Sequence, residues 1–466
     1  MIAGNAATSA TVERQSARAW YAVGVLVLAY VFSIMDRQIL TVMVGPIQKS
    51  LGVNDTMMGL LHGFTFAAFY SIMGFPIARM IDRGHRPVIL AIGIAMWSLA
   101  TAAGGLATEY WHLFVARIGV AVGEAVLIPG AVSLLGDLFT AEKRSRAMGI
   151  FGAAGPVGAG MGLLAGGILL GIFTAAPPVL PGIGALTAWQ ATFIAVGLPG
   201  VVVALMVLLV PEPRRNRARA GLAAPAVPVR AAVEYVRTNR RTFAAVILGT
   251  GFFYTGTYAW AAWTPTFFVR ELGWTYPQIG KVMGIVLVVA GPLGTVSGVW
   301  LADRLRQTGV GHANLRVAML ACAGMASATT LMVFGGSTTV SVVALIAAAM
   351  LCFVPFGLGS LMIQECSPVP IRGQLAALFT GVLNIIGVGL GPVLAGAITD
   401  YGFRDPAMIG ASLVLTCVTS SLIGLVLFRR GVVSYAKTCD HAAHWHPDAS
   451  ADDMAGALPA VPTTTR

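Results

Sequence analysis

The chain has 466 residues, of which 57% are hydrophobic and only 11% are charged, and its mean hydropathy is +0.80. Soluble domains carry about 25% charged residues, so this composition excludes an ordinary water-soluble enzyme, and the high apolar content excludes a disordered chain. The net charge is +11, but the charges are spread over loops between long apolar stretches, as in a membrane protein, rather than gathered for nucleic acid binding.

Twelve apolar stretches are each long enough to cross a bilayer, whose hydrocarbon core of about 30 Å needs about 20 helical residues. They are long and do not alternate between polar and apolar residues, which argues against the strands of a membrane barrel. We therefore expect an all-α polytopic membrane protein with twelve transmembrane helices. The predicted spans are 20–45, 57–78, 87–107, 111–136, 147–172, 188–210, 242–268, 276–302, 315–335, 339–363, 374–399 and 406–428.

The charged loops predict the orientation of the chain in the membrane. If the amino-terminal segment 1–19 lies inside, most of the 30 Lys and Arg residues fall in loops on that side. Only Lys49, Arg270, Lys281 and Arg404 fall in loops on the opposite side. By the positive-inside rule, we expect both termini in the cytoplasm and the protein in a plasma membrane, or in the inner membrane of a bacterium.

The longest inside loop, 211–241, divides the spans into an N-terminal six-helix bundle over 20–210 and a C-terminal one over 242–430. Residues 230–241 could form a basic helix that lies on the membrane surface. A tether between the two bundles is the favoured interpretation.

The tail, 431–466, is polar and is expected to be disordered. It contains Cys439, His441, His444 and His446, which are residue types that bind metal ions. Because we expect no ordered element to hold them, we predict no metal site, and no cofactor is expected elsewhere in the chain.

The two halves repeat each other at matched loops. An acid stands seven residues before an arginine after the fourth span and again after the tenth. Paired six-helix halves are typical of transporters whose site lies between two rocking bundles. The charges could be topology anchors alone, but charged pairs at helix ends can also hold one closed arrangement, and gating is the favoured interpretation. The predicted gating residues are Asp82, Arg83, Asp137, Arg144, Asp303, Arg304, Glu365 and Arg372.

Four ionisable residues lie well inside the spans, namely Asp36 and Arg37 in the first span and Arg117 and Glu124 in the fourth. Each costs about 2.5–3.5 kcal/mol at a helix centre, so they persist only if they pair, face a wet cavity or act in transport. A purely structural ion-pair lattice is the alternative, although buried ion pairs stabilise weakly. We expect Asp36 and Glu124 to exchange protons, Arg117 to be the primary anion contact, and Arg37 to clamp Asp36.

The second half has no comparable charges but has an aromatic wall. In span seven, Tyr254, Thr257 and Tyr258 share one helix face, and Trp260 and Trp263 share another. Span eleven adds Asn384. Such aromatic stripes are often packing, yet a charged wall opposite an aromatic wall suits an amphipathic substrate. These six residues are the predicted substrate contacts of the second half. No Walker lysine follows a Gly-rich loop, which excludes an ATP-driven pump.

Together these features resemble the major facilitator superfamily and, within it, the Spinster-like branch. The resemblance is carried by Met35-Asp36-Arg37, by Gly59 to His62 with Asp82-Arg83, by Ala116-Arg117 through Gly123-Glu124-Ala125, by Asp137 through Gly149, and by Gly256 through Pro265. It implies secondary transport of lysophospholipids or sphingoid lipids by alternating access, with proton coupling. It also implies that Asp36, Arg37, Arg117 and Glu124 are the central coupling and head-group residues.

The Asp36-Arg37 pair in span one and Arg117 and Glu124 in span four also resemble the anion:cation symporter branch. A proton-coupled symporter of small organic anions such as sugar acids is therefore an alternative. A multidrug exporter and a non-transporting receptor are further alternatives. In each transporter case we expect the protein to be a monomer and not an enzyme. Its expected partners are a small amphipathic or anionic substrate, protons and membrane lipids, with no nucleic acid.

Overall fold

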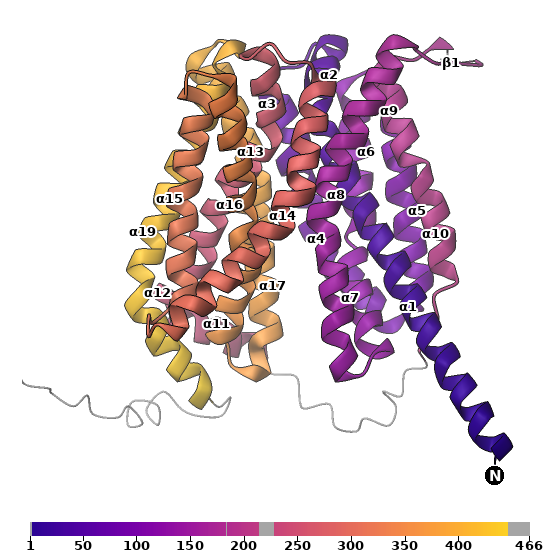
Figure 1. The fold of residues 1–466 in the computed structure, drawn as a ribbon, viewed down its shortest axis with the longest axis vertical. Helices are drawn as coiled ribbons and strands as arrows, with labels where there is room; N and C mark the ends of the chain where they lie inside the picture. The colour runs from indigo at the N-terminus through magenta and orange to yellow at the C-terminus, as the bar shows by residue number, and fades with distance from the viewer. Residues whose placement is uncertain (1, 183, 214–227, 446–466) are drawn as a thin grey trace, which may run out of the picture.

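The computed structural model describes residues 2–182, 184–213 and 228–445. These residues are almost entirely helical, apart from a short antiparallel hairpin of β1 (Val179–Leu180) and β2 (Gly184–Ala185). The helices form two bundles that stand side by side, indigo to magenta for the first half and red to yellow for the second (Figure 1). The predicted all-α fold of two bundles is thereby confirmed.

The N-terminal bundle contains six spans, several of which are interrupted. The bounds are α1 (Ile2–Gln38), α2 (Val44–Leu51), α3 (Asp55–Gly59), α4 (Thr65–Arg83), α5 (Arg86–Gly104), α6 (Tyr110–Glu124), α7 (Leu127–Leu138), α8 (Ala141–Ala175), α9 (Ala188–Gly197) and α10 (Pro199–Leu208). Helices α1–α2, α3–α4, α6–α7 and α9–α10 are each one broken span. A capping box between Thr187 and Gln190 starts α9, and Pro199 starts α10, where the first turn tolerates proline.

The C-terminal bundle contains the other six spans and the end of the linker. The bounds are α11 (Val229–Thr238), α12 (Arg240–Phe243), α13 (Gly249–Arg270), α14 (Tyr276–Gln307), α15 (Ala313–Phe334), α16 (Thr338–Glu365), α17 (Arg372–Leu383), α18 (Gly391–Ala397) and α19 (Ile409–His444). Helices α12–α13 and α17–α18 are joined by π-helical segments, so each pair forms one span.

Eleven helical segments of the described chain are long and apolar enough to cross a membrane. Helix α13 is the twelfth; it is less apolar because it is rich in Thr, Tyr, Trp and Gly, yet its 22 residues extend about 33 Å. Large apolar side chains such as Ile92, Val202, Leu205, Val289 and Val296 are exposed on the surface. So much exposed apolar surface fits a protein surrounded by lipid.

The two ends of the molecule differ. The amino terminus and the end of α19 lie on opposite sides of the same end of the molecule (Figure 1), which we call the basic end because α4 and α19 carry arginines there. The opposite end, near α2, α3 and the hairpin, we call the sealed end. The bundles approach each other there and separate toward the basic end (Figure 1).

Glycines permit the close approach at the sealed end. A Cβ atom added at Gly160 of α8 would lie 2.5 Å from the Gly284 carbonyl oxygen of α14. A Cβ atom added at Gly59 of α3 would lie 2.5 Å from the Pro392 carbonyl oxygen of α18. Any larger residue would force these helices apart, so backbone-to-backbone packing joins the bundles at this end.

The tail differs from the sequence prediction. Helix α19 continues to His444, well past the predicted end of the last span at 428, so residues 431–444 are not disordered. Gly431, Tyr435 and Thr438 are buried, and this packing against the bundle explains why the helix persists in a polar stretch. Residue His446 and the rest of the tail lie outside the described residues.

The end of the linker forms a short helix, as one of the two interpretations expected. Tyr235 of α11 is buried and donates a hydrogen bond to the Cys366 carbonyl oxygen at 3.1 Å. This contact packs α11 against the C-terminal bundle. Linker residues 214–227 lie outside the described residues.

Candidate functional site

The four ionisable residues predicted inside the spans gather in the N-terminal bundle, and we call them the central charge cluster. Arg37, near the end of α1, donates from Nε to Glu124 Oε2 at 2.6 Å. Glu124 is the last residue of α6, and Ser33 also donates to its Oε2, at 2.8 Å. The Glu124 side chain has no exposed surface, whereas 26% of the Arg37 side chain is exposed. Arg37 therefore lies between a buried carboxylate and open space.

Asp36 points to a different helix from Arg37. Its Oδ2 accepts a hydrogen bond from Thr101 of α5 at 3.0 Å, and its Oδ1 has no partner among the described residues. The expectation that Arg37 clamps Asp36 is wrong in this conformation, because neighbours on a helix diverge by about 100°. Glu124 Oε1 likewise has no hydrogen-bond partner in the described structure. Each carboxylate thus keeps one oxygen free for a proton or a ligand.

Arg117 is buried on the same helix as Glu124, α6, nearer to the start of that helix. Its Nη1 donates to the Asp36 carbonyl oxygen at 3.3 Å and its Nε to the Leu61 carbonyl oxygen at 3.4 Å. It forms no ion pair with a described carboxylate. A buried guanidinium held only by long bonds to neutral carbonyls retains unused capacity for an anion.

Aromatic rings surround the Arg37 guanidinium. Its Cζ lies 4.1 Å from the Phe66 ring centroid and 5.4 Å from that of Tyr70, both on α4. Tyr258 of α13, in the C-terminal bundle, packs against the hydrophobic core that contains Phe66, so this region lies at the contact between the bundles. We call the Phe66 and Tyr70 rings the aromatic collar.

The residues predicted on α13 divide into two groups. Tyr254 and Tyr258 have ring centroids 6.0 Å apart, and Thr257 donates its hydroxyl to the Tyr254 carbonyl oxygen at 3.1 Å. Trp260 and Trp263 are fully buried, and the Trp263 indole donates to the Pro392 carbonyl oxygen at 2.9 Å. The structure therefore brings Tyr258 to the charge cluster and places the two tryptophans in the packing of the C-terminal bundle.

Asn384 is half-buried and begins a π-helical segment, Asn384–Leu390, that the sequence analysis did not predict. A second such segment, Leu60–Phe64, lies in span two, and the two segments contact each other across the bundles. π-helical turns are often found at functional sites, because they break the regular ladder of hydrogen bonds. The sequence carries no clear signal for them.

The sealed end carries a cross-bundle network that the sequence analysis missed. Arg270, at the end of α13, donates to both carboxylate oxygens of Asp55 at 2.7 and 2.8 Å and to Gln48 Oε1 at 2.8 Å. The Asp400 carboxylate accepts hydrogen bonds from the backbone and hydroxyl of Thr56, at 2.7 and 2.6 Å. These contacts, together with the hydrogen bond from the Gly45 amide to the Tyr276 hydroxyl, join the two bundles at this end.

At the basic end of the N-terminal bundle, Arg86 is the central group. It is fully buried, donates to Asp137 Oδ2 at 2.7 Å and to the Ser133 carbonyl oxygen at 2.9 Å, and pairs with Glu212 through Nε at 2.9 Å. The predicted gating residue Asp137 thus has a partner in its own bundle. Arg144 donates to the Phe139 carbonyl oxygen at 3.3 Å, and Asp82 and Arg83 are exposed.

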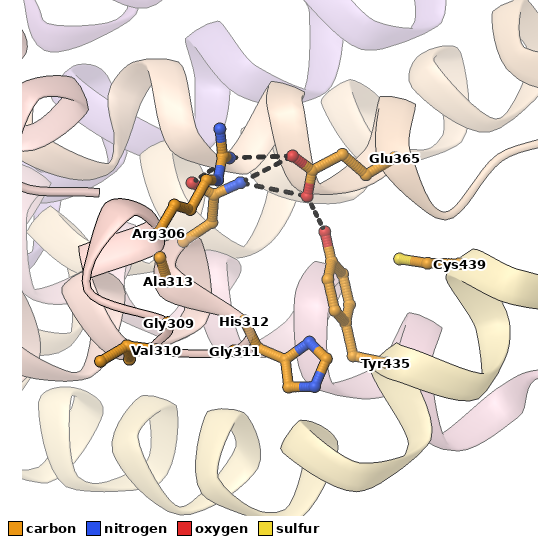
Figure 2. Close-up of a pocket in the computed structure, with 10 residues that line it drawn as sticks. Arg306, Gly309, Val310, Gly311, His312, Ala313, Glu365, Tyr435 and Cys439 are labelled. Atoms are coloured by element: carbon orange, nitrogen blue, oxygen red, sulfur yellow. Dashed lines mark hydrogen bonds and ion pairs between the residues drawn. The ribbon is translucent and has the colours of Figure 1, made fainter. Parts of the chain in front are cut away.

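The C-terminal bundle has a matching network at the same end. Glu365 accepts hydrogen bonds from Arg306 at 3.0 Å, from Asn314 at 3.0 and 3.1 Å, and from the Tyr435 hydroxyl at 2.6 Å. Figure 2 shows Glu365 between Arg306 and Tyr435, beside a cavity of about 510 Å³. Asp303 pairs with Arg306 at 3.3 Å.

The two other gating residues predicted in this bundle also have local contacts. Arg304 lies over the Trp300 ring at 5.6 Å, and Arg372 donates to the Ser367 carbonyl oxygen. In this conformation the described contacts of Asp137, Arg144, Asp303, Glu365 and Arg372 lie within their own bundles.

Replacing Arg86 with methionine should destabilise the N-terminal bundle. The change removes the charge that pairs with Asp137 and Glu212, whose side chains are 40% and 20% exposed, so the cost should be below the about 3–5 kcal/mol of a fully buried pair. We expect the Tm of the detergent-solubilised protein to fall by several degrees. The exposed Arg79 is the control, and an equal effect of Arg79→Met would contradict the assignment.

Within the described residues, no group of three His, Cys, Asp or Glu side chains is placed to hold a metal ion. Cys439 and His441 lie on α19, and His441 is 5.2 Å from the Tyr235 ring.

Comparison with known proteins identifies the family. Residues 26–392 match the family described as Major Facilitator Superfamily. An MFS-type efflux pump of Mycolicibacterium smegmatis is 32% identical over 291 residues, which cover 62% of this chain and 64%, less than two thirds, of the pump. Protein spinster homolog 1 of Bos taurus is 29% identical over 416 residues, which cover 82% of this chain and 73% of that protein.

A solved structure has the same fold. It is a bacterial homologue of the human lysosomal transporter Spinster in an inward-facing and unoccupied conformation, and it matches with a TM-score of 0.71 at 23% identity, over 92% of this chain and 99% of that one. This chain belongs to the major facilitator superfamily and, within it, is similar to Spinster proteins.

Proposed function

We propose that the protein is a proton-coupled secondary transporter of an amphipathic lipid with an anionic or zwitterionic head, such as a lysophospholipid or a sphingoid phosphate. The observation that carries the proposal is the position of Arg37. Its guanidinium is partly exposed, is held by the buried Glu124 carboxylate, and is surrounded by the aromatic collar. A charged contact beside apolar rings suits a molecule with an anionic head and an apolar chain.

Competition for Arg37 couples cargo to protons in this mechanism. An anionic head group that binds Arg37 displaces Glu124, whose carboxylate then lies buried without a counter-charge. An uncompensated buried carboxylate is costly, so Glu124 takes up a proton at that moment. Loss of the proton restores the pair between Arg37 and Glu124 and expels the cargo. Asp36, whose Oδ1 is free, is the second proton-responsive group, and Arg117 supplies further positive charge.

Alternating access provides the movement. We place the basic end in the cytoplasm, so that the cluster is reached from inside while the sealed end is closed. Opening the sealed end breaks the contacts of Asp55 with Arg270 and of Asp400 with Thr56. The predicted gating residues at the basic end would then meet across the bundles and hold that end closed. The protein works as a monomer in the plasma membrane, or in a bacterial inner membrane.

A thermal-shift panel tests the cargo class on the purified protein at two pH values. We expect a lysolipid or sphingoid phosphate to raise the Tm of the wild type, and its apparent affinity to fall at least about tenfold in Arg37→Ala, because a hydrogen bond to a charged group is lost. Arg79→Ala is the control for loss of an exposed charge. Equal stabilisation of wild type and Arg37→Ala by the lipid would contradict the head-group role.

A symporter of small organic anions is the second candidate, and the weakly held Arg117 guanidinium favours it. In that case a soluble hexuronate stabilises the protein and lysolipids do not. An exporter of cationic drugs would instead respond to lipophilic cations and would be indifferent to Arg117→Ala. The same panel separates the three cargo classes.

A further inference from the structure

A second cavity lies at the sealed end, between the two bundles. Its volume is about 800 Å³, within the range of about 300–1,000 Å³ of small-molecule sites. Lys49 of α2, Leu170 and Thr174 of α8, and Trp189 of α9 line it from the N-terminal bundle. Trp274 and the first turn of α14 close it from the C-terminal bundle.

The polar side chains that line this cavity include one lysine and several hydroxyl groups. Lys49 is exposed and supplies an ammonium group. Trp189 is 1% exposed, and its indole Nε1–H has no acceptor among the described residues. Helices α9 and α14 both begin at the cavity, at Thr187 and Thr275, so two positive helix ends point to the same space. None of the described lining residues is acidic.

The remainder of the wall is apolar. Leu170, Trp274 and Pro277, together with the ring faces of Trp189 and Tyr276, surround the space beside the polar groups. Together with the Lys49 ammonium group and the absence of acidic side chains among the described lining residues, this wall matches a ligand with an anionic head and a short apolar chain.

We propose that this cavity binds a single-chain amphiphile with an anionic head, which contacts Lys49 and lays its chain against Trp274 and Pro277. The site is separate from the central charge cluster and does not depend on the cargo proposed there. Because its walls belong to both bundles, an opening of the sealed end would pull them apart. A bound amphiphile therefore favours the conformation in which this end is closed.

Photolabelling tests the site directly. The full-length protein in zwitterionic nanodiscs is labelled with a diazirine derivative of dodecyl phosphate added from solution, and in a parallel arm with a diazirine lysophosphatidylglycerol placed in the membrane. Mass spectrometry should find the label in peptides that contain Lys49 or Trp274. Labelling from solution alone identifies a free amphiphile as the source, and labelling in the membrane arm alone identifies a lipid.

Matched variants distinguish the cavity from the general lipid surface. We expect Lys49→Gln to weaken the labelling about tenfold, because a charge-assisted contact is lost, and Lys49→Arg to retain it. Thr174→Trp should fill the cavity and abolish labelling. Lys281→Gln and Ile172→Trp change exposed residues of α14 and α8 outside the cavity and should have no effect. Equal labelling of wild type, Lys49→Gln and Thr174→Trp, or equal labelling by a diazirine dodecanol, would overturn the proposal.

A transport measurement tests the effect on conformation. Dodecyl phosphate should inhibit substrate uptake by the wild type, and Lys49→Gln should raise the inhibitory concentration about tenfold without changing the uninhibited rate. Inhibition that persists unchanged in Lys49→Gln would place the inhibitor at the central cluster instead. Since labelling needs no transport, a failure of the proposed cargo leaves the labelling test of this cavity intact.

Discussion

Uptake driven by a pH gradient is expected to be lost in Glu124→Gln. Glutamine keeps the shape of the side chain and can still accept from Arg37, but it cannot gain or release a proton or balance the guanidinium charge. The lost charge-assisted hydrogen bond alone is worth about 1.5–3 kcal/mol, so Arg37 becomes permanently available to the anion. Purified protein in liposomes should show gradient-driven uptake reduced by about 100-fold, whereas exchange of labelled for unlabelled cargo across the membrane should persist.

Two controls make that result specific. Glu142→Gln removes an exposed carboxylate at the start of α8 and should leave uptake unchanged. Ser33→Ala removes only the second hydrogen bond to Glu124 Oε2 and should lower the rate severalfold without abolishing coupling. Gradient-driven uptake at the wild-type rate in Glu124→Gln would remove Glu124 from the coupling mechanism.

Asp55→Asn should open the sealed end. Asp55 is nearly fully buried, accepts two hydrogen bonds from Arg270 and one from Gln48 at 2.7 Å, and joins span two to span seven. Removing the charge leaves Arg270 without its anion, and breaking such a pair costs about 3 kcal/mol, which shifts the ratio of the two conformations on the order of 100-fold. Hydrogen exchange at backbone amides 55–58 should accelerate by a similar factor.

The matched control at the same end is Asp405→Asn. Asp405 accepts a hydrogen bond only from the Ala407 amide in its own loop, at 2.9 Å, so its loss should leave exchange at 55–58 unchanged. Arg270→Gln should reproduce the effect of Asp55→Asn, and the double variant should be no more open than either single variant. Additive effects of the two substitutions would show that the pair does not act as one latch.

The sequence predicted the elements that depend on local patterns. Long apolar stretches define the spans, and the cost of burying a charge singles out Asp36, Arg37, Arg117 and Glu124 without any knowledge of their contacts. The sequence could not tell which of the neighbours Asp36 and Arg37 faces Glu124, because both rotations of α1 satisfy the apolar pattern. In the structure Arg37 donates to Glu124, and Asp36 accepts a hydrogen bond from Thr101.

The sequence analysis also did not predict contacts between segments that are far apart in the chain. Arg86 and Arg270 were counted only as loop charges, yet Arg86 pairs with Glu212, 126 residues away, and Arg270 with Asp55, 215 residues away. No local spacing relates such partners. The polar stretch after 428 was misjudged because the Tyr435 hydroxyl reaches Glu365 only once α19 packs against α13 and α15.

The central claim is that the buried charge cluster exchanges protons for cargo, and counting protons tests it most directly. Cargo is added to purified protein in weakly buffered solution, and the change in bound protons is measured with a pH indicator. The mechanism predicts uptake of about one proton per cargo bound by the wild type and none by Glu124→Gln. Saturable cargo binding with no proton uptake by the wild type, or with the same uptake by Glu124→Gln, would contradict the account.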